Sequence, residues 1–278
     1  MPTKPLIGPT TRLCMSLAAR PGTFGTRFHN RLYEVLGLDF VYKAFSTQDL
    51  EGAVRGIRAL DIRGCAVSMP FKEAVIPLLD GLAHSAAAID SVNTIVNDAN
   101  GNGDGVLTGH NTDYAAVARL IADIDPATRF VLRGSGGMAK AVAAALRDAG
   151  FRDGTIVARN AAAGQGLAAL YGFGWSAELG DAAAGLLLNV TPLGMTGGDV
   201  DALAFPQAMI AASNVVVDVV QYPPETPLLR AARAAGKRVI TGAGVATLQA
   251  LDQFVLYTGV TPSDDQVAEA AAFARASG

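Results

Sequence analysis

From about Arg129 onward, the chain alternates short apolar runs with alanine-rich segments, and this rhythm restricts the possible folds more than any other feature. The β-rich runs are Phe130–Leu132, Thr155–Ala158, Leu186–Asn189, Val215–Val220 and Arg238–Ile240. Helical segments such as Ala139–Ala149, closed by Gly150, separate them. Strands that alternate with helices in this way are typical of βαβ units on a parallel sheet. The continuous apolar character of Val215–Val219 suits a central strand covered on both faces.

A glycine-rich turn follows the first of these strands and opens the next helix. It consists of Gly134, Ser135, Gly136, Gly137, Met138, Ala139 and Lys140. Glycines without a Cβ let the backbone approach a pyrophosphate, and a helix N-terminus supplies free N–H groups and a positive dipole. Many βα loops carry glycines only for packing, but here strand, loop and helix occur in the order that a dinucleotide site requires. We therefore predict a Rossmann-type, doubly wound nucleotide-binding domain.

The end of the expected strand Thr155–Ala158 indicates which dinucleotide is bound. It is followed by Arg159 and Asn160, where a site for NAD usually places an acidic residue on the ribose 2′-hydroxyl. Arg159 instead suits the 2′-phosphate of NADP, and Lys140 adds positive charge near the phosphates. The alternative is that Arg159 is a solvent-facing arginine at a strand end. NADP is the predicted cofactor, and acceptance of NAD stays open.

The N-terminal part mixes strands and helices in another α/β pattern. Strands are expected at Leu13–Leu17, Phe40–Phe45, Gly64–Ser68 and Val92–Asn97, and helices at Arg27–Leu36 and Leu50–Leu60. Gly37 suits a left-handed cap of the first helix. The turn-rich tract Asn97–Gly105 between strand-like segments predicts a hairpin.

The last part of the chain has helical periodicity. Leu248, Leu251 and Phe254 form an apolar stripe, and Ser263 with Gln266 predicts a capping box. We expect residues 1–108, completed by C-terminal helices in 245–278, to form an α/β substrate-binding and catalytic domain. Residues 109–244 would form the NADP-binding domain. The Gly242-x-Gly244 step is a candidate hinge or turn before the terminal helices.

Charge and hydropathy exclude several classes of protein. The net charge is −3 and no basic stripe for nucleic acid is present. No run approaches the ~20 apolar residues of a membrane helix, and the start lacks signal-peptide features, so a cytoplasmic protein is expected. Cys14 and Cys65 sit in apolar strand-like runs, which favours buried reduced thiols. The histidines have no metal-ligand spacing with them, so no metal is predicted.

Two polar strings carry the chemistry. The first is Ser68-Met69-Pro70-Phe71-Lys72, and the second is Asn111-Thr112-Asp113. A lone lysine or aspartate is usually a solvated surface charge. A lysine behind a Pro-Phe turn, a matching carboxylate and a dinucleotide loop together indicate a dehydrogenase that acts on a small hydroxylated molecule.

These motifs and several others resemble those of the shikimate dehydrogenase family over nearly the whole chain. The matching segments are Phe28-His29-Asn30, Val67–Lys72, Ser91–Ile95, Gly109–Asp113, Gly134–Gly137, Ala158–Asn160, Asn189–Met195, Thr226–Leu229 and Gln249-Ala250. The resemblance implies reversible, NADP-dependent interconversion of shikimate and 3-dehydroshikimate, or of a close relative, in the shikimate pathway of aromatic amino acid biosynthesis. It implies a small cyclic hydroxy acid as substrate. We expect no nucleic acid or membrane partner, and either a monomer or a homodimer.

The resemblance also implies roles for single residues. Lys72 would exchange the proton of the hydroxyl being oxidised, and Asp113 would hold that hydroxyl and tune the lysine. Asn93 and Gln249 would bind the other ring hydroxyls. Thr23 and Ser68 would be further substrate contacts, and Thr191 a further cofactor contact. Lys72 and Asp113 are expected to titrate as a coupled pair.

Three positions depart from the family pattern. The usual Ser-x-Ser before His-Asn, which binds the substrate carboxylate, is Thr23-Phe24-Gly25 here. The usual Asn-Val-Thr is Ala66-Val67-Ser68, and a usual tyrosine is Gln221. Ser16, Thr26, Arg20 and Arg27 are candidates to compensate for this loss, although surface exposure is favoured for both arginines. The chain therefore looks like the divergent shikimate dehydrogenase-like subgroup, and weak oxidation of shikimate itself is expected.

Three other functions compete with this interpretation. Quinate or aminoshikimate dehydrogenases keep the lysine–aspartate pair and differ at the residues around the ring. A methylenetetrahydrofolate dehydrogenase relative is disfavoured by Asn111-Thr112-Asp113 and Gln249. A catalytically poor NADP-binding regulatory module would explain the altered carboxylate motif, but it would not need all of Lys72, Asp113, Asn93 and Gln249.

Overall fold

The computed structural model describes residues 4–98, 105–180 and 183–276. The chain divides into two compact units, one made of residues 1–112 and 247–278 and the other of residues 113–246. The domain boundaries that the sequence predicted lie after residues 108 and 244, whereas the units of the structure divide after residues 112 and 246. Within the described residues, no helix is long and apolar enough to cross a membrane.

The first unit is built on a mixed six-stranded sheet in the order β2-β1-β3-β5-β6-β4. Its strands are β1 (Arg12–Leu17), β2 (Phe40–Phe45), β3 (Gly64–Val67), β4 (Gly81–Leu82), β5 (Thr94–Asp98) and β6 (Val106–His110). β1 pairs in parallel with β2 and β3, whereas β5 is antiparallel to both β3 and β6. The antiparallel pairing of β5 with β6 confirms the predicted hairpin strands, while most of the turn between them lies outside the described residues.

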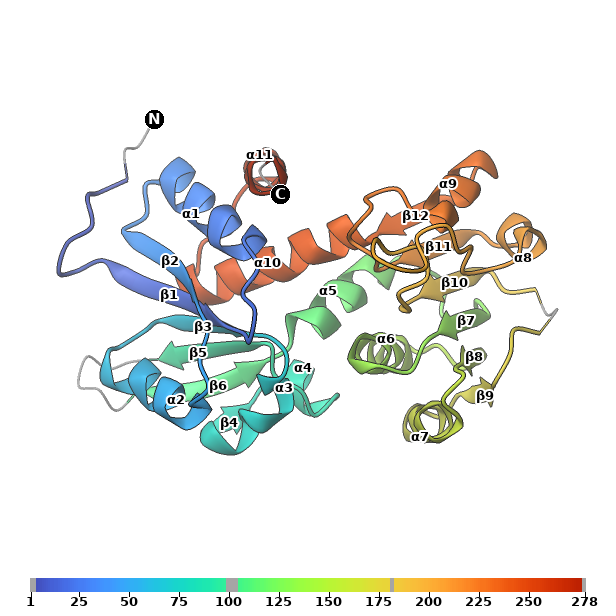
Figure 1. Ribbon diagram of the computed structural model, residues 1–278, viewed down its shortest axis with the longest axis horizontal. Helices are drawn as coiled ribbons and strands as arrows, with labels where there is room; N and C mark the ends of the chain where they lie inside the picture. Colours follow the sequence, from blue (N-terminus) through green and yellow to red (C-terminus); the bar gives the residue numbers. More distant parts are fainter. Residues whose placement is uncertain (1–3, 99–104, 181–182, 277–278) are drawn as a thin grey trace. The chain divides into compact units, whose positions relative to one another are not determined.

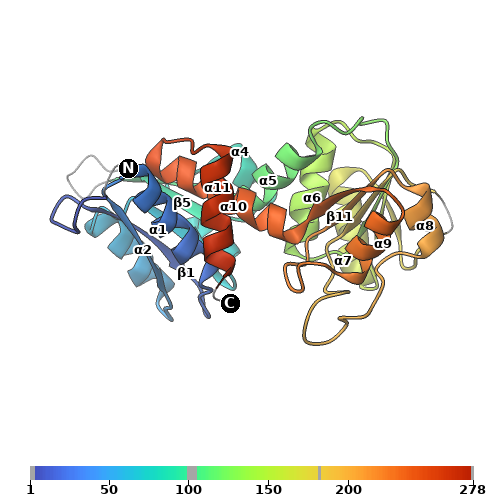
Figure 2. The same cartoon turned by 90° about the horizontal axis from the view of Figure 1, so that it is seen from above.

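Helices cover both faces of this sheet. They are α1 (Phe24–Leu36), α2 (Leu50–Ala59), the short α3 (Phe71–Ala74), η1 (Ile76–Leu78) and α4 (His84–Ala87), the part of α10 (Gly242–Thr258) from residue 247, and α11 (Asp264–Arg275). Figures 1 and 2 show α1 beside α11, with α2 on the other side of the sheet. One buried cluster joins α1, α10 and α11 to the sheet, and a second lies under α2.

Local signals account for the ends of these helices. α1 starts at Phe24, earlier than the expected Arg27, and ends at Gly37, which has the predicted left-handed conformation with φ 65°. The predicted capping box is present at α11, where Ser263 and Gln266 bond to each other's backbone N–H groups. The expectation of a turn at Gly242-x-Gly244 is wrong, because α10 begins at Gly242.

The two cysteines lie on adjacent strands but on opposite faces. Cys14 of β1 is in register with Gly64, while Cys65 of β3 is in register with Met15. Cys14 belongs to the cluster under α1, and Cys65 to the cluster under α2. Since neighbouring residues of a strand point to opposite faces, the two thiols cannot meet. Both are buried and free, as predicted.

The second unit contains a six-stranded sheet in the order β12-β11-β10-β7-β8-β9. Its strands are β7 (Phe130–Arg133), β8 (Gly154–Val157), β9 (Gly174–Ser176), β10 (Leu186–Asn189), β11 (Val215–Asp218) and β12 (Arg238–Thr241). Every neighbouring pair is parallel. This strand order is the doubly wound arrangement of Rossmann domains, which confirms the predicted fold class. β9 is an addition that the sequence pattern did not reveal.

Helices alternate with these strands along the chain. They are α5 (Thr112–Ile121), α6 (Gly137–Asp148), α7 (Ala161–Tyr171), α8 (Gln207–Ala212) and α9 (Pro227–Ala234). Buried side chains of α8 and α9 pack on one face of the sheet against Val131, Val157, Leu187 and Val216. The strand order reverses between β7 and β10, so the loop after β7 lies at the switch point where ligands bind in open α/β sheets.

Candidate functional site

The glycine loop after β7 is shaped for a ligand and not only for packing. Gly134 has φ +128°, and a Cβ there would lie 2.7 Å from Val190 Cγ2, so the fold itself requires glycine. A Cβ on Gly136 or Gly137 would meet nothing within 4 Å. α6 begins here with no side-chain cap and no acidic residue in its first turn. The open backbone and the uncapped helix N-terminus fit the pyrophosphate of a dinucleotide.

Arg133, which was not among the residues predicted from the sequence, lies close enough to Arg159 for their charges to interact. Arg133 is the last residue of β7 and is in register with Val157 of β8, two residues before Arg159. Arg133 and Val157 therefore share one face of the sheet, and Arg159 follows two residues after the end of β8. Burial and, second, the charge of Arg159 lower the pKa of Arg133. Arg133 also donates a hydrogen bond to the carbonyl of Ala204.

These two arginines form a region of positive charge at the carboxyl ends of adjacent strands. In the described part of the chain, neither has an ion pair with an acidic side chain. Arg159 is exposed and Arg133 half-buried. An anionic group of a cofactor would relieve their mutual repulsion. The only available signal for Arg133 was its position directly before Gly134.

A buried polar network fixes the loops after β10 and β11. Asp218 Oδ1 accepts from Asn189 Nδ2 at 3.0 Å and from Val220 N at 3.2 Å, and Asp218 Oδ2 accepts from Thr226 Oγ1 at 2.6 Å. Burial raises the pKa of Asp218, and these three hydrogen bonds oppose the rise. Asn189 Oδ1 accepts from both the N–H and the hydroxyl of Thr191. The hydroxyl proton of Thr191 is therefore used within its own loop.

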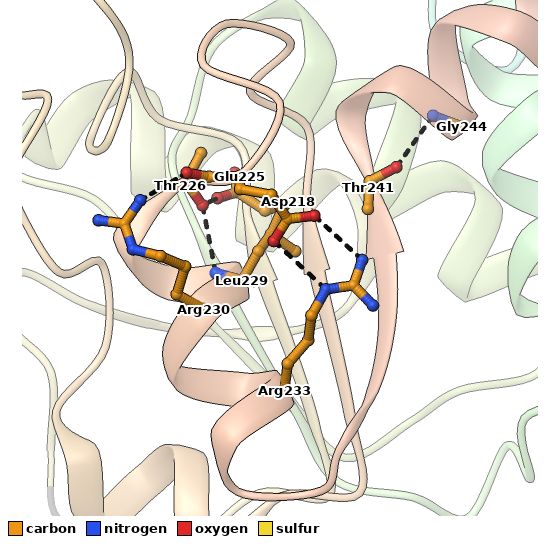
Figure 3. Close-up of polar contacts among 8 residues, drawn as sticks. All are labelled: Asp218, Glu225, Thr226, Leu229, Arg230, Arg233, Thr241 and Gly244. Atoms are coloured by element: carbon orange, nitrogen blue, oxygen red, sulfur yellow. Dashed lines mark hydrogen bonds and ion pairs between the residues drawn. The ribbon is translucent and has the colours of Figure 1, made fainter.

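Figure 3 shows how the same network holds the start of α9. Thr226 is the N-cap and accepts from Leu229 N at 3.2 Å while donating to Asp218. An exposed ion pair between Arg233 and Glu225, 3.2 Å apart, lies on the outside of this turn. The loops beyond the carboxyl ends of β10 and β11 are thus held in place from within the fold.

In the first unit, polar side chains converge on the amide of Asn93. Asn93 Oδ1 accepts from Thr94 Oγ1 at 2.8 Å and from Thr112 N at 2.8 Å. Asn93 Nδ2 lies 3.1 Å from Thr112 Oγ1, to which it donates. Only 5% of Asn93 is exposed, so water does not compete for these bonds. The side chain is held rigidly as a candidate ligand-binding group.

The residues next to the predicted catalytic pair belong to this arrangement. Lys72 is half-buried on the short helix α3, and its backbone carbonyl accepts from Val92 N, directly before Asn93, at 2.8 Å. Asp113 directly follows Thr112 and is 9% exposed. The two residues are assigned to different units. Their role as a proton-exchanging pair remains a prediction.

α10 carries a second side-chain amide, Gln253, which was not predicted from the sequence as Gln249 was. Gln249 and Gln253 lie four residues apart, on one face of the helix, and both are half-buried. Gln253 Nε2 donates to Thr94 Oγ1 at 3.0 Å and lies 3.4 Å from Asn93 O. Gln253 carried no motif signal in the sequence, because its partner lies on a distant strand.

The altered carboxylate motif lies at the start of α1. Thr23 is the exposed N-cap residue, and its side chain makes no capping hydrogen bond. A Cβ on Gly25 would have one neighbour within 4 Å, the hydroxyl of Tyr42 at 3.8 Å. Burial raises the pKa of Tyr42, and a hydrogen bond with Ser16 opposes this rise. Ser16 and Tyr42 therefore provide hydroxyl groups near the space left at Gly25.

The other candidate substrate contacts differ in environment. Ser68 is exposed directly after β3, where its N–H donates to Leu17 O. Arg20 is exposed, as expected. The expectation of a solvated surface position for Arg27 is wrong. Its Nη2 donates to Phe273 O at 2.9 Å and its guanidinium lies 4.5 Å from the Phe273 ring, because α1 packs against α11.

These features define a class of α/β proteins that have two units. One unit is a doubly wound sheet with a loop of the kind that binds dinucleotides, and the other is a mixed sheet that carries clustered side-chain amides. The family profile of the shikimate dehydrogenase substrate binding domain matches residues 23–95. A shikimate dehydrogenase-like protein of Haemophilus influenzae is 54% identical over 273 residues, covering 97% of this chain and 99% of that protein. The chain belongs to the shikimate dehydrogenase family.

Solved structures agree with this assignment. A shikimate 5-dehydrogenase-like protein of 54% identity matches with a TM-score of 0.94, covering 97% of this chain and all 100% of that one. The shikimate 5-dehydrogenase of Thermus thermophilus, in complex with NADP(H) and shikimate, matches with a TM-score of 0.81 at 30% identity, covering 95% and 100%. Quinate dehydrogenase of Corynebacterium glutamicum, in complex with NAD, gives 0.84 at 29% identity, covering 95% and 98%.

Proposed function

We propose that this protein is an NADP-dependent oxidoreductase that interconverts shikimate and 3-dehydroshikimate, or a closely related cyclic hydroxy acid, and is weak on shikimate itself. The observation that carries the proposal is the buried, fully oriented amide of Asn93. Asn93 directly follows Val92, whose N–H donates to the backbone carbonyl of Lys72. Its side chain is hydrogen-bonded to Thr112, the residue before Asp113. An amide held in this way suits recognition of a hydroxyl group on a small molecule.

Lys72 and Asp113 are the proposed proton-transfer pair. Hydride leaves the carbinol carbon as the hydroxyl loses its proton, so an oriented base lowers the barrier. Lys72 Nζ takes that proton in oxidation and returns it in reduction. Asp113 holds the reacting hydroxyl beside that lysine. Asn93, Gln249, Thr23 and Ser68 are the proposed substrate contacts.

The second unit is the proposed NADP site. The backbone of Ser135, Gly136 and Gly137 and the N-terminus of α6, with Met138, Ala139 and Lys140, would hold the pyrophosphate. Arg159, with Asn160, would hold the adenosine 2′-phosphate, and Arg133 adds charge at the end of the neighbouring strand β7. The bound cofactor accepts or donates the hydride.

Weak activity on shikimate follows from the start of α1. Gly25 offers no hydroxyl to a carboxylate, and Arg27 is engaged by Phe273. Loss of one hydrogen bond to a charged group costs about 1.5–3 kcal/mol, or roughly tenfold to over a hundredfold in affinity. We therefore propose that the preferred substrate is a modified or different cyclic hydroxy acid.

Two alternative functions stay within this framework. A quinate or aminoshikimate-type dehydrogenase would use the same pair, and the resemblance to an NAD-bound quinate dehydrogenase favours testing NAD as well. A catalytically poor NADP-binding regulatory module would bind the cofactor without turnover.

The test is initial-rate oxidation of shikimate, quinate and related ring acids with NADP and with NAD. Lys72→Ala is the test variant, and Glu73→Ala, an exposed residue of the same helix, is its control. We expect slow shikimate turnover with NADP, a loss of at least about a hundredfold in Lys72→Ala, and near-normal rates in Glu73→Ala. Turnover that survives in Lys72→Ala contradicts the proposed mechanism. NADP binding without turnover of any acid supports the regulatory module.

A further inference from the structure

Gln253 lies at the start of a directed chain of hydrogen bonds that ends at Asn93. We propose that Gln253 is a positioning residue which, acting through Thr94, fixes Asn93 as a hydrogen-bond donor toward the substrate. This inference rests on the proposed function, because it assigns the polarity of a proposed substrate contact. It adds a residue that is not among the predicted site residues.

The chain of contacts is short and continuous. Gln253 Nε2 lies 3.0 Å from Thr94 Oγ1, and Thr94 Oγ1 lies 2.8 Å from Asn93 Oδ1. Asn93 Oδ1 also accepts from Thr112 N at 2.8 Å. Each distance is within the normal range for a hydrogen bond. Thr94 is fully buried and Thr112 is 1% exposed, so no solvent is available to replace these bonds.

The direction of the chain follows from the chemistry of its members. The Nε2 of a glutamine only donates, so Thr94 Oγ1 must accept from Gln253. The single proton of the Thr94 hydroxyl is then available for Asn93 Oδ1. Because the backbone N–H of Thr112 also needs an acceptor there, the oxygen of Asn93 receives these two donors, and the hydroxyl of Thr112 lies 3.3 Å from it as well. The amide cannot flip without placing its own N–H groups against those donors.

This orientation has a consequence for the substrate. With Oδ1 occupied, Nδ2 points to Thr112 Oγ1 at 3.1 Å and uses one of its two N–H groups there. The second N–H has no partner in the described part of the chain and is left to donate to a ligand oxygen. Asn93 therefore recognises an acceptor, such as a hydroxyl lone pair or a carbonyl oxygen.

Gln253 also joins the two proposed amide contacts. It lies one helical turn from Gln249 on α10 and reaches the strand β5 that begins directly after Asn93. The same hydrogen bond therefore sets the polarity of Asn93 and holds the face of α10 that carries Gln249 against β5.

The test uses Gln253→Glu, which keeps the shape of the side chain but reverses its hydrogen-bonding character. At pH 8 the carboxylate only accepts, so the Thr94 hydroxyl turns toward it and Asn93 Oδ1 loses a donor. We expect the KM for the acid substrate to rise about tenfold, with kcat within about threefold of the parent. As the pH falls, the protonated glutamic acid donates again, and the KM of this variant should return toward the parent value.

Two threonine variants separate the relay from mere packing. Thr94→Val removes the relay and should raise KM by a similar factor at every pH. Thr94→Ser keeps the hydroxyl and should stay close to the parent protein. A Gln253→Glu variant whose KM matches the parent at all pH values overturns the inference, as does a Thr94→Ser variant as impaired as Thr94→Val.

A readout without substrate distinguishes this inference from the proposed function. If the parent protein oxidises no ring acid in a Lys72-dependent manner, the proposed function fails. The relay is then judged from the exchange rates of the Asn93 side-chain amide protons, measured by NMR. Faster exchange in Gln253→Glu at pH 8 than in the parent, and a difference that disappears at low pH, supports the relay. Equal rates at both pH values overturn it.

Discussion

His29 offers a quantitative test of the packing in the first unit. It lies on α1, is fully buried, and stacks on Tyr42 with ring centroids 4.5 Å apart and an interplanar angle of 1°. Neither ring nitrogen has a hydrogen-bond partner in the described structure. Burial lowers the pKa of His29 from 6.5 to about 3, although the nearby side chain of Gln253 opposes this drop. We predict that His29 makes the protein less stable as the pH falls.

The sign and size follow from proton linkage. Below pH 6.5 the unfolded chain binds a proton at His29 and the native protein does not, so the free energy of unfolding decreases as the pH falls. Each pKa unit corresponds to about 1.4 kcal/mol. The loss reaches about 2 kcal/mol at pH 5 and ends near the native pKa of about 3. Above pH 6.5 the side chain is neutral in both states and contributes no pH dependence.

The assay compares the parent with His29→Phe in urea unfolding at pH 7.5, 6 and 5. The sole tryptophan, Trp175, lies in the second unit, so circular dichroism is a better probe of the first unit than fluorescence. The phenylalanine changes the packing at all pH values, but it cannot bind a proton. The free energy of unfolding of the variant relative to the parent should therefore rise by about 2 kcal/mol between pH 7.5 and 5. His84→Gln, at an exposed position, is the control.

A difference between parent and His29→Phe that stays constant over this range would refute the reasoning. It would mean that the side chain of Gln253 offsets the effect of burial on His29, or that the ring is accessible to water. A change of the same size in His84→Gln would show that the titration does not arise from burial.

Further predictions concern single positions. Gly64→Ala should cost at least about 2 kcal/mol in urea unfolding, because its Cβ would lie 2.1 Å from the Tyr257 ring; a loss below about 0.5 kcal/mol contradicts this. Gly136→Ala should weaken NADP binding at least about tenfold by calorimetry and leave Tm within a few degrees of the parent value. The added Cβ meets no protein atom within 4 Å, but it would collide with a pyrophosphate bound on this loop. Ser263→Ala should destabilise the protein by about 1 kcal/mol through loss of the α11 capping box, whereas unchanged stability would show that this helix end frays.

Much of the fold could be predicted from the sequence because its signals are local. The alternation of strand and helix in the second half identifies the doubly wound sheet, since each element is defined by a few consecutive residues. Gly37 and the Ser263–Gln266 box mark helix ends through bonds that span only a few positions. The candidate catalytic and cofactor residues were predicted in the same way, from contiguous motifs, and they remain predictions.

Contacts between distant segments could not be predicted, because they depend on strand register and on which helix faces meet. Gln253 reaches Thr94 across 159 residues of sequence, and Arg27 reaches Phe273 across 246. Arg133 was missed because its proximity to Arg159 exists only once β7 and β8 pair in register. Residue types and short spacings in the sequence determine the elements and their ends. Only the tertiary structure decides which polar groups meet, because pairing and packing bring them together.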